Sequence, residues 1–250
     1  MAGHKTGIRS RNLYNPLSGK PFKLSRSRLE GFIQCPRCFY LDRRLGIDRP
    51  SMPGWTLNSA VDALLKKEFD SFRLKGIPHP LMIEHGIDAV PFQHDQMDVW
   101  RENFKGVEYL HPQTNLVISG AVDDIWVNSR DSLHVVDYKS TSTQEEIRLD
   151  TEYRQGYKRQ MEIYQWLLRM NGYNVSDTGF FVYANALKTP DEFNARLTFS
   201  MQVIEYAGNA SWVEQCVVDA HQCLILEEIP APNPECEYCL YRSAARGVEI

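Results

Sequence analysis

The chain has 250 residues, which is enough to bury one substantial hydrophobic core. Its apolar content of 43% and charged content of 24% are ordinary for a globular protein and exclude a fibrous or low-complexity chain. No apolar run approaches the roughly 18 residues that a membrane span needs, and the basic start of the chain lacks the apolar core of a secretory signal. We therefore expect a cytoplasmic protein that has no membrane partner.

Charge is distributed unevenly along the chain. The net charge is −4, yet residues 1–49 hold eleven basic and three acidic residues, a balance of +8. A basic segment on an acidic body suggests a region that contacts phosphate groups, and a solvated basic tail is the alternative. Residues 1–22 lack hydrophobic periodicity, so we interpret them as a basic flexible arm and residues 23–250 as a single domain.

Hydrophobic periodicity, capping residues and turn residues predict the elements in chain order. The predicted helices cover residues 27–34, 59–74, 95–104 and 153–171, and a last helix begins at Ser211. The predicted strands cover residues 107–111, 116–127, 133–139, 178–184 and 196–206. Residues 76–93 read as a loop, and the tail has three prolines followed by the second cysteine pair. This order predicts an α/β (α+β) fold in which helices flank a central mixed β-sheet.

The stretch over residues 116–139 reads as a hairpin around a polar turn at 128–132. If the hairpin closes symmetrically about this turn, Asp123 lies opposite Asp137. Side chains two apart on a strand share a face, so Asp123, Asp137 and Lys139 would project together. Two carboxylates and an ammonium on an apolar face are costly unless something binds them, and hard cations such as Mg²⁺ take carboxylate oxygens.

Three motifs carry a family resemblance: Gly120-Ala121-Val122-Asp123, Asp137-Tyr138-Lys139 and Gln160-x-x-x-Tyr164. Together they resemble the RecB-like branch of the PD-(D/E)XK nuclease superfamily, above all the CRISPR-associated exonucleases that carry an iron–sulfur cluster. The resemblance covers nearly the whole chain and implies a restriction-endonuclease-like core. It also implies a Mg²⁺- or Mn²⁺-dependent exodeoxyribonuclease that acts on single-stranded or end-exposed DNA.

The resemblance assigns a role to each residue of the hairpin site. Asp123 and Asp137 would be metal ligands, with the main-chain carbonyl of Tyr138 as a third, and Lys139 would orient or deprotonate the attacking water. A cation held in this way acts as a Lewis acid and lowers the pKa of bound water. The alternative is a structural ion triad on a hairpin.

Two further positions belong to the predicted site. Gln160 and Tyr164 are four apart on one helix face, and the resemblance places both near the metal, where they would hold phosphate or water. The alternative is a core tyrosine beside a solvated glutamine. Relatives usually carry a metal-binding His on the long helix before the hairpin, whereas residues 59–66 have none. Asp62 takes about this place and would suit Mg²⁺ or Mn²⁺, although a surface Asp near a helix N-terminus is equally expected.

The missing His motivates a second hypothesis. The chain could be a catalytically inactive nucleic-acid-binding or assembly subunit that retains the nuclease fold. Salt-sensitive DNA binding that is independent of metal, without cleavage, would distinguish it from an enzyme.

Two Cys-x-x-Cys pairs lie near the ends of the chain: Cys35, Cys38, Cys236 and Cys239. Without an export signal, they indicate metal ligation rather than disulfides. The spacing alone fits tetrahedral zinc, while the resemblance implies a 4Fe-4S cluster. Relatives usually place one cysteine early and three late, so zinc stays open, as do separate buried thiols. A shared metal would staple the N-terminal helix to the C-terminal tail and contribute to folding.

The basic segment contains candidate nucleic-acid ligands. They are Arg26, Arg28, Arg37, Arg43 and Arg44. Aromatic residues interleave with them over 37–44, a pattern that would guide a single strand by charge and stacking, although these aromatic rings are as well suited to packing. DNA is therefore the expected partner. The sequence carries no signal for protein partners or for an oligomeric state.

Overall fold

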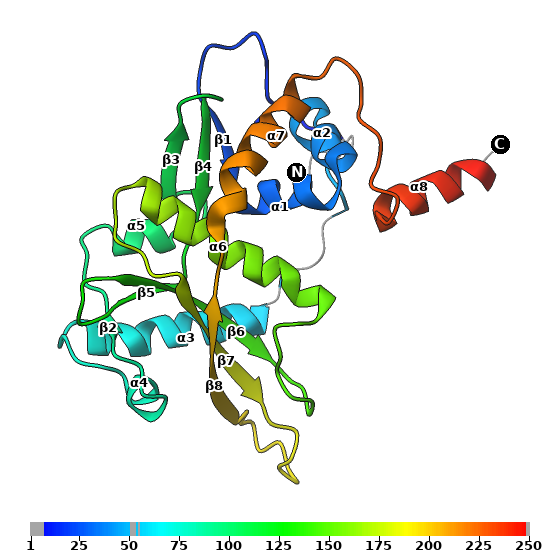
Figure 1. Cartoon of the computed structure of the whole chain (residues 1–250). Coiled ribbons are helices and arrows are strands. Elements are labelled where there is room, and N and C mark those ends of the chain that lie inside the picture. Colours follow the sequence, from blue (N-terminus) through cyan, green and yellow to red (C-terminus); the bar gives the residue numbers. More distant parts are fainter. Residues whose placement is uncertain (1–7, 51–53, 55, 249–250) are drawn as a thin grey trace, which may run out of the picture. The chain divides into compact units, whose positions relative to one another are not determined.

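The computed structural model of the chain describes residues 8–50, 54 and 56–248 (Figure 1). The first seven residues of the predicted basic arm lie outside the described residues. The helices are α1 (Arg26–Gln34), α2 (Pro36–Leu45), α3 (Thr56–Arg73), α4 (Pro80–Glu84), α5 (Met97–Arg101), α6 (Gln155–Met170), α7 (Val213–Ile225) and α8 (Glu237–Val248). The strands are β1 (Phe22–Ser25), β2 (Val90–Pro91), β3 (Val107–His111), β4 (Leu116–Gly120), β5 (Asp124–Val127), β6 (Leu133–Thr141), β7 (Thr178–Ala186) and β8 (Phe199–Ala207).

These elements form two sheets and two compact units. One sheet has the order β1-β4-β3 and the other the order β2-β5-β6-β7-β8. Unit 1 comprises residues 1–53, 110–118 and 211–250, and unit 2 comprises residues 54–109 and 119–210. The predicted class, α/β with a mixed sheet and flanking helices, is confirmed. None of the helices in the described part of the chain has the length and apolar character that a membrane crossing requires.

Strand β6 is the centre of the five-stranded sheet in unit 2. It pairs antiparallel with β5 and parallel with β7. Residues 133–138 are buried without interruption, as expected for a strand that is covered on both faces. In β5–β6, Asp124 pairs with Val136 and Val127 with Leu133, which confirms the predicted closure about the turn.

The continuous strand predicted over residues 116–127 is wrong, because β4 ends at Gly120 and belongs to the other sheet. A side chain at Gly120 would collide with the ring of Tyr164, and one at Gly106, which has φ +74°, would collide with the carbonyl group of Gly120. The Val122 N–H donates to a carbonyl in α5 at 3.0 Å instead of to a strand. The chain therefore turns between the sheets, and Asp123 stands at the start of β5 rather than inside the ladder.

Helix α3 packs on one face of this sheet through a large apolar cluster. Its Leu65 and Phe69 lie against Val136 and Tyr138 of β6. Phe69 is fully buried, which stabilises the folded state by roughly 1.5–3 kcal/mol relative to an exposed side chain. Because successive side chains of a strand alternate between faces, Asp137 lies on the opposite face of β6, which α6 covers.

Unit 1 contains α1, α2, α7 and α8. Cys35 is extended, so α1 ends there, and α2 begins with Pro36 and ends at Gly46, which has φ +77°. Helices α1 and α2 pack on each other and on α7. Helix α8 follows Cys236 in the tail, where the sequence pattern predicts no helix.

Two other boundaries differ from the prediction. The loop predicted over residues 76–93 contains α4 and β2, and the helix predicted over 95–104 shortens to α5. Helix α4 is capped by the His79 ring, which accepts the Leu81 N–H at 3.1 Å. Histidine is not a usual capping residue, so the sequence contains little signal for this helix.

Candidate functional site

Unit 2 brings together a group of charged and polar side chains from four segments, which we call the carboxylate site. Its members are Asp62 and Lys66 of α3, Asp123 before β5, Asp137 and Lys139 of β6, and Gln160 and Tyr164 of α6. The predicted residues therefore lie close together, and Lys66 is an addition that the sequence did not indicate.

Asp137 forms the buried part of the carboxylate site. Its side chain is fully buried and forms an ion pair with Lys139. Gln160 Nε2 donates to Asp137 Oδ1 at 2.8 Å and lies 3.2 Å from the Tyr164 hydroxyl oxygen. The Lys139 ammonium lies 4.6 Å from the centroid of the Tyr157 ring, which adds a cation–π contact. The amide and the two rings on α6 thus fix the carboxylate and the ammonium.

Asp123 lies beside the main chain of β6. Its Oδ2 accepts the Tyr138 N–H at 2.9 Å, and its Oδ1 lies 3.3 Å from Lys66 Nζ. Lys66 Nζ also donates to Asp62 Oδ2 at 2.9 Å. One ammonium therefore joins the two carboxylates of Asp62 and Asp123. The sequence contains a weak signal for Lys66, because Asp62 and Lys66 have the i, i+4 spacing of any surface ion pair on a helix.

Mutual electrostatics keep both lysines of the site charged. Burial lowers the pKa of Lys139, but Asp137 and Asp123 raise it by more, so the net pKa lies above the ordinary value. Burial likewise lowers the pKa of Lys66, and Asp123 and Asp62 more than compensate. Burial and the neighbouring Asp123 raise the pKa of Asp62 despite the Lys66 partner. Each lysine is therefore an ammonium at neutral pH.

The donor groups of the site fit a hard divalent cation. The three carboxylates and the main-chain carbonyl of Tyr138 offer only oxygen atoms, which Mg²⁺ and Mn²⁺ take. Asp137 is a fully buried carboxylate whose partners include the Gln160 amide and the Lys139 ammonium. Burial of this carboxylate is costly, and a bound cation would lower that cost.

Asp124 adjoins Asp123 but has different surroundings. It is fully buried, Arg101 Nη2 lies 2.8 Å from its Oδ1, and the Tyr138 hydroxyl donates to its Oδ2 at 2.7 Å. Arg73 forms a second ion pair with it. Asp124 is thus a structural carboxylate on the α3 face of the sheet.

Tyr183 is a further residue that the sequence did not indicate, because it ends the apolar run of β7. It is in register with Lys139 across β6 and β7 and is 2% exposed. Its hydroxyl has no hydrogen-bond partner among the residues that the structure describes. Burial raises its pKa to about 12, and Asp137 adds to this shift while Arg154 opposes it.

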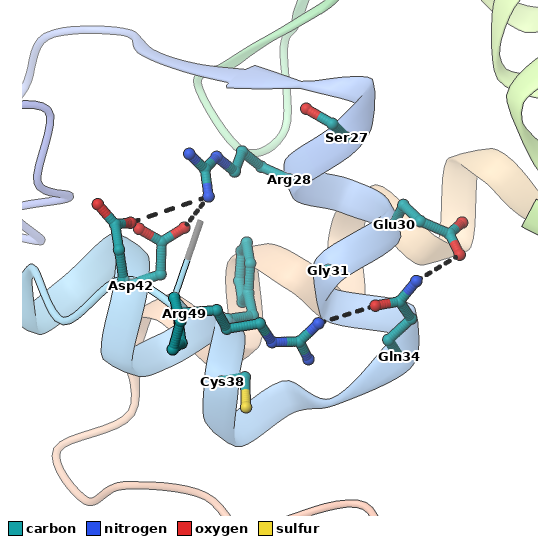
Figure 2. Close-up of a pocket in the computed structure, with 11 residues that line it drawn as sticks. Ser27, Arg28, Glu30, Gly31, Gln34, Cys38, Asp42 and Arg49 are labelled. Carbon is teal, nitrogen blue, oxygen red and sulfur yellow. Dashed lines mark hydrogen bonds and ion pairs between the residues drawn. The ribbon is translucent and has the colours of Figure 1, made fainter. Parts of the chain in front are cut away.

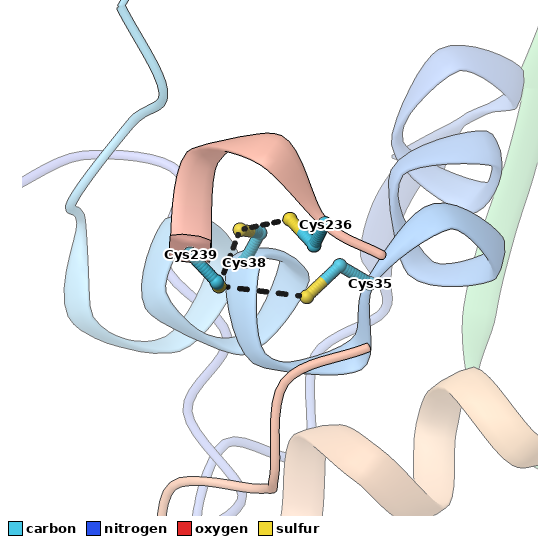
Figure 3. A group of neighbouring side chains, drawn as sticks. All are labelled: Cys35, Cys38, Cys236 and Cys239. Carbon is cyan, nitrogen blue, oxygen red and sulfur yellow. Dashed lines mark hydrogen bonds between the residues drawn. The ribbon is translucent and has the colours of Figure 1, made fainter. Parts of the chain in front are cut away.

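The four cysteines form a second cluster, in unit 1, which we call the cysteine site. Figure 3 shows Cys35, Cys38, Cys236 and Cys239 pointing toward one another, and all four sulfur atoms lie within 4.8 Å of each other. Cys38 Sγ lies 3.6 Å from the sulfur atoms of both Cys236 and Cys239, and Cys35 Sγ lies 3.8 Å from Cys239 Sγ. The predicted proximity of the two pairs is confirmed, and the residues fit a metal ion.

The cysteine site also contains a cation. Arg49 Nη2 lies 3.9 Å from Cys236 Sγ, and the guanidinium stacks over the Tyr238 ring at 4.6 Å. Burial raises the pKa of the Cys35 thiol, but main-chain N–H groups and the neighbouring cysteines lower it to about 7. A thiol with this pKa is readily deprotonated, as metal ligation requires.

Arg49 also lines a cavity of about 380 Å³ in unit 1 (Figure 2). Arg49 Nη1 donates to Gln34 Oε1 at 2.8 Å, and Gln34 Nε2 donates to Glu30 Oε1 at 3.2 Å. Arg28 Nη1 lies 2.8 Å from Asp42 Oδ2 on the other side of the cavity. The polar groups that line this cavity are therefore largely bonded to one another.

The five candidate nucleic-acid ligands occupy different environments. Arg43 is buried and donates to Asp42 at 2.6 and 2.8 Å. Arg44 donates to the Tyr14 carbonyl oxygen at 3.2 Å. Arg28 is exposed, while Arg26 and Arg37 are half-buried. Of the five, Arg28 is the most accessible to a partner.

Comparison with known proteins connects this geometry to a family. The model of the PD-(D/E)XK nuclease superfamily matches residues 56–244, three quarters of the chain. SSO0001, a protein of known crystal structure, is similar at 18% identity over 94% of this chain and 86% of that chain, with a TM-score of 0.35. A structural similarity of this size carries no argument about fold or function. A search of curated proteins gives no match.

Proposed function

Because the chain belongs to the PD-(D/E)XK nuclease superfamily, we propose that it is a metal-dependent nuclease that hydrolyses phosphodiester bonds of DNA. The substrate is a single-stranded or end-exposed strand, and the enzyme is a RecB-like exonuclease. The observation that supports this proposal most is the convergence of Asp123, Asp137 and Lys139 in one half-buried site.

Asp123, Asp137 and the Tyr138 carbonyl would hold Mg²⁺ or Mn²⁺. When bound, this cation supplies a Lewis acid and lowers the pKa of bound water. Asp62, the fourth candidate ligand, accepts a hydrogen bond from Lys66 at 2.9 Å.

The side chains of the site supply orientation and charge. In the hydrolysis, a water molecule gives up one proton to the solvent and its oxygen attacks phosphorus, the bond to the leaving sugar oxygen breaks, and that oxygen takes up a proton from the solvent. Lys139 lies beside Asp137, and it would orient the water and stabilise negative charge on the phosphate oxygens. Gln160 fixes Asp137, and its contact with the Tyr164 hydroxyl keeps both groups directed at the reacting phosphate.

We propose zinc as the metal of the cysteine site. Four thiolates at about 2.3 Å from one tetrahedral ion lie about 3.8 Å from each other. Three sulfur–sulfur distances, of 3.6, 3.6 and 3.8 Å, are close to this value, and all four sulfur atoms lie within 4.8 Å of each other. In a 4Fe-4S cluster each thiolate binds a different iron atom, which spaces the thiolates further apart. Metal analysis of anaerobically purified protein should find zinc, and a brown, iron-containing sample would favour the cluster.

A nuclease assay on the purified full chain tests the proposal. End-labelled single-stranded and duplex DNA should be degraded with Mn²⁺ or Mg²⁺, and Asp137→Ala and Lys139→Ala should each lower the rate at least about 100-fold, since each removes charge stabilisation of several kcal/mol. Asp98→Ala and Lys67→Ala change exposed residues and serve as controls.

Two results would refute the assignment. Equal activity in Asp137→Ala and in the controls would remove Asp137 from the chemistry. Salt-sensitive DNA binding that needs no metal, without cleavage by any variant, would instead indicate a nucleic-acid-binding subunit with a nuclease fold.

A further inference from the structure

Lys66 belongs to the carboxylate site but takes no part in the hydrolysis described above. Its ammonium lies between two carboxylates, 2.9 Å from Asp62 Oδ2 and 3.3 Å from Asp123 Oδ1. Its side chain is 21% exposed, so it belongs to the interior of the site and not to the surface of α3. A hard divalent ion binds carboxylate oxygens, so the Lys66 ammonium stands where an ion held by Asp62 and Asp123 would otherwise lie.

The charges of the site indicate how many divalent ions it can hold. Three carboxylates and two ammonium groups leave one negative charge. One divalent cation would change this to one positive charge, which the single negative charge of a phosphodiester link balances. A second divalent cation would leave an excess of positive charge in a half-buried site, where uncompensated charge is costly.

The contacts of Asp123 allow Lys66 to stay in place when an ion binds. One oxygen of Asp123 accepts the Tyr138 N–H and the other faces Lys66. Each carboxylate oxygen has two lone pairs, so each can accept a further partner. A first cation can therefore bind Asp123 and Asp137 without displacing the ammonium.

We propose that the Lys66 ammonium takes the place of a second divalent cation, so that the carboxylate site binds one Mn²⁺ or Mg²⁺ ion. This inference rests on the proposed nuclease function. Lys66 supplies a fixed positive charge beside Asp123, which stabilises the negative charge that grows on the phosphoryl group. Asp62 is then a positioning residue that holds Lys66, and not a fourth metal ligand.

Counting bound Mn²⁺ tests the proposal without an activity assay. Titration of the intact protein, with free Mn²⁺ measured by electron paramagnetic resonance, gives the number of ions per chain. The number of ions bound by Asp137→Asn is subtracted from the number bound by each other protein, which corrects for Mn²⁺ bound at the cysteine site. Wild type should then bind one ion, and Lys66→Met should bind two, because the vacated position leaves Asp62 and Asp123 facing each other. Lys66→Arg keeps the charge and should bind one, as should Lys67→Met, the matched change of an exposed neighbour.

The role of Asp62 has its own variant. Asp62→Asn should bind the first ion with an affinity within threefold of wild type, because Asp62 contacts Lys66 and not the ion. A tenfold or greater loss of affinity would make Asp62 a ligand and overturn its positioning role.

The remaining outcomes separate this inference from the function on which it rests. Two ions in wild type, or one ion in Lys66→Met, would overturn the role of Lys66 and leave the nuclease proposal intact. Equal counts in wild type and Asp137→Asn would overturn both. A thermal melt of each variant confirms that the counts refer to folded protein.

Discussion

The cysteine site and the carboxylate site handle charge in opposite ways. In the cysteine site, four buried sulfur ligands lie at the spacing of a single ion, and Arg49 is the cation that contacts them among the residues that the structure describes. In the carboxylate site, each carboxylate already contacts an ammonium, and the Asp123 side chain remains 23% exposed. The first has the character of a closed structural site, while the second is open to solvent and to exchangeable ligands.

This difference has an energetic meaning. Four thiolates that share one arginine as counter-ion would depend on a metal, so metal binding at the cysteine site should contribute to the folding energy of unit 1. The lysines of the carboxylate site neutralise most of its charge, so unit 2 should fold without metal. Three experiments test this contrast, in order of decreasing expected effect.

The largest effect is expected from Cys236→Ser. Removing one of four thiolates should release the metal, and structural zinc contributes on the order of 10 kcal/mol in small domains. Amide hydrogens of α1 and α2 should exchange at least about 100-fold faster, while those of α3 and α6 keep their protection. Cys216→Ser, a change at a buried cysteine of α7 outside the cluster, is the control. Retention of zinc and of protection in Cys236→Ser would show that the cysteines are only packed.

An intermediate effect separates two adjacent aspartates. Asp124→Ala removes the buried partner of Arg73 and Arg101 and leaves them only the more exposed Asp70, which should lower the free energy of unfolding by about 3 kcal/mol and the melting temperature by about 10 °C. Asp123→Ala should lower the free energy of unfolding by less than about 1 kcal/mol, because Lys66 keeps its ion pair with Asp62. The same variant should abolish cleavage of DNA. If both variants lower the melting temperature equally, Asp123 has a structural role, and the contrast between the cysteine site and the carboxylate site is weaker.

The smallest effect concerns Tyr183. Its buried hydroxyl lacks a partner among the described residues, so Tyr183→Phe should raise the stability by about 1 kcal/mol at neutral pH. The pKa is raised to about 12 from 10.0, so the neutral form is favoured in the folded state. Wild type therefore loses up to about 2.7 kcal/mol of stability as the pH rises from 10 to 12, a loss that Tyr183→Phe should lack. Urea unfolding of both proteins across this range measures the difference. Parallel pH profiles would show that the hydroxyl is solvated.

Local sequence patterns account for part of the fold and of the site. The register of β5 and β6 was predictable, because a polar turn between apolar runs specifies both the turn and the buried faces. The proximity of Gln160 to Asp137 followed from the family motifs. The interruption of the strand before Asp123 could not be predicted in this way. It depends on the close approach of Gly106 to Gly120, which lie on separate segments of the chain.

Other features depend on tertiary context that no short pattern contains. Lys66 appears in the sequence as a common i, i+4 ion pair, and only the approach of Asp123 places it in the site. Helix α8 follows a stretch with three prolines. Its one buried residue is Cys239, a member of the cysteine site. Its apolar pattern alone was therefore a poor predictor of the helix.

The contact between Gly120 and Tyr164 connects the packing of an aromatic ring to the polar groups around Asp137. The Tyr164 ring occupies the space that a side chain at position 120 would need, while its hydroxyl lies beside the amide that holds Asp137. One aromatic residue thus acts as a spacer and as a polar partner at once. Any residue larger than glycine at position 120 would therefore push this ring away from Gly120 and disturb the hydroxyl that contacts Gln160, although position 120 itself carries no polar side chain.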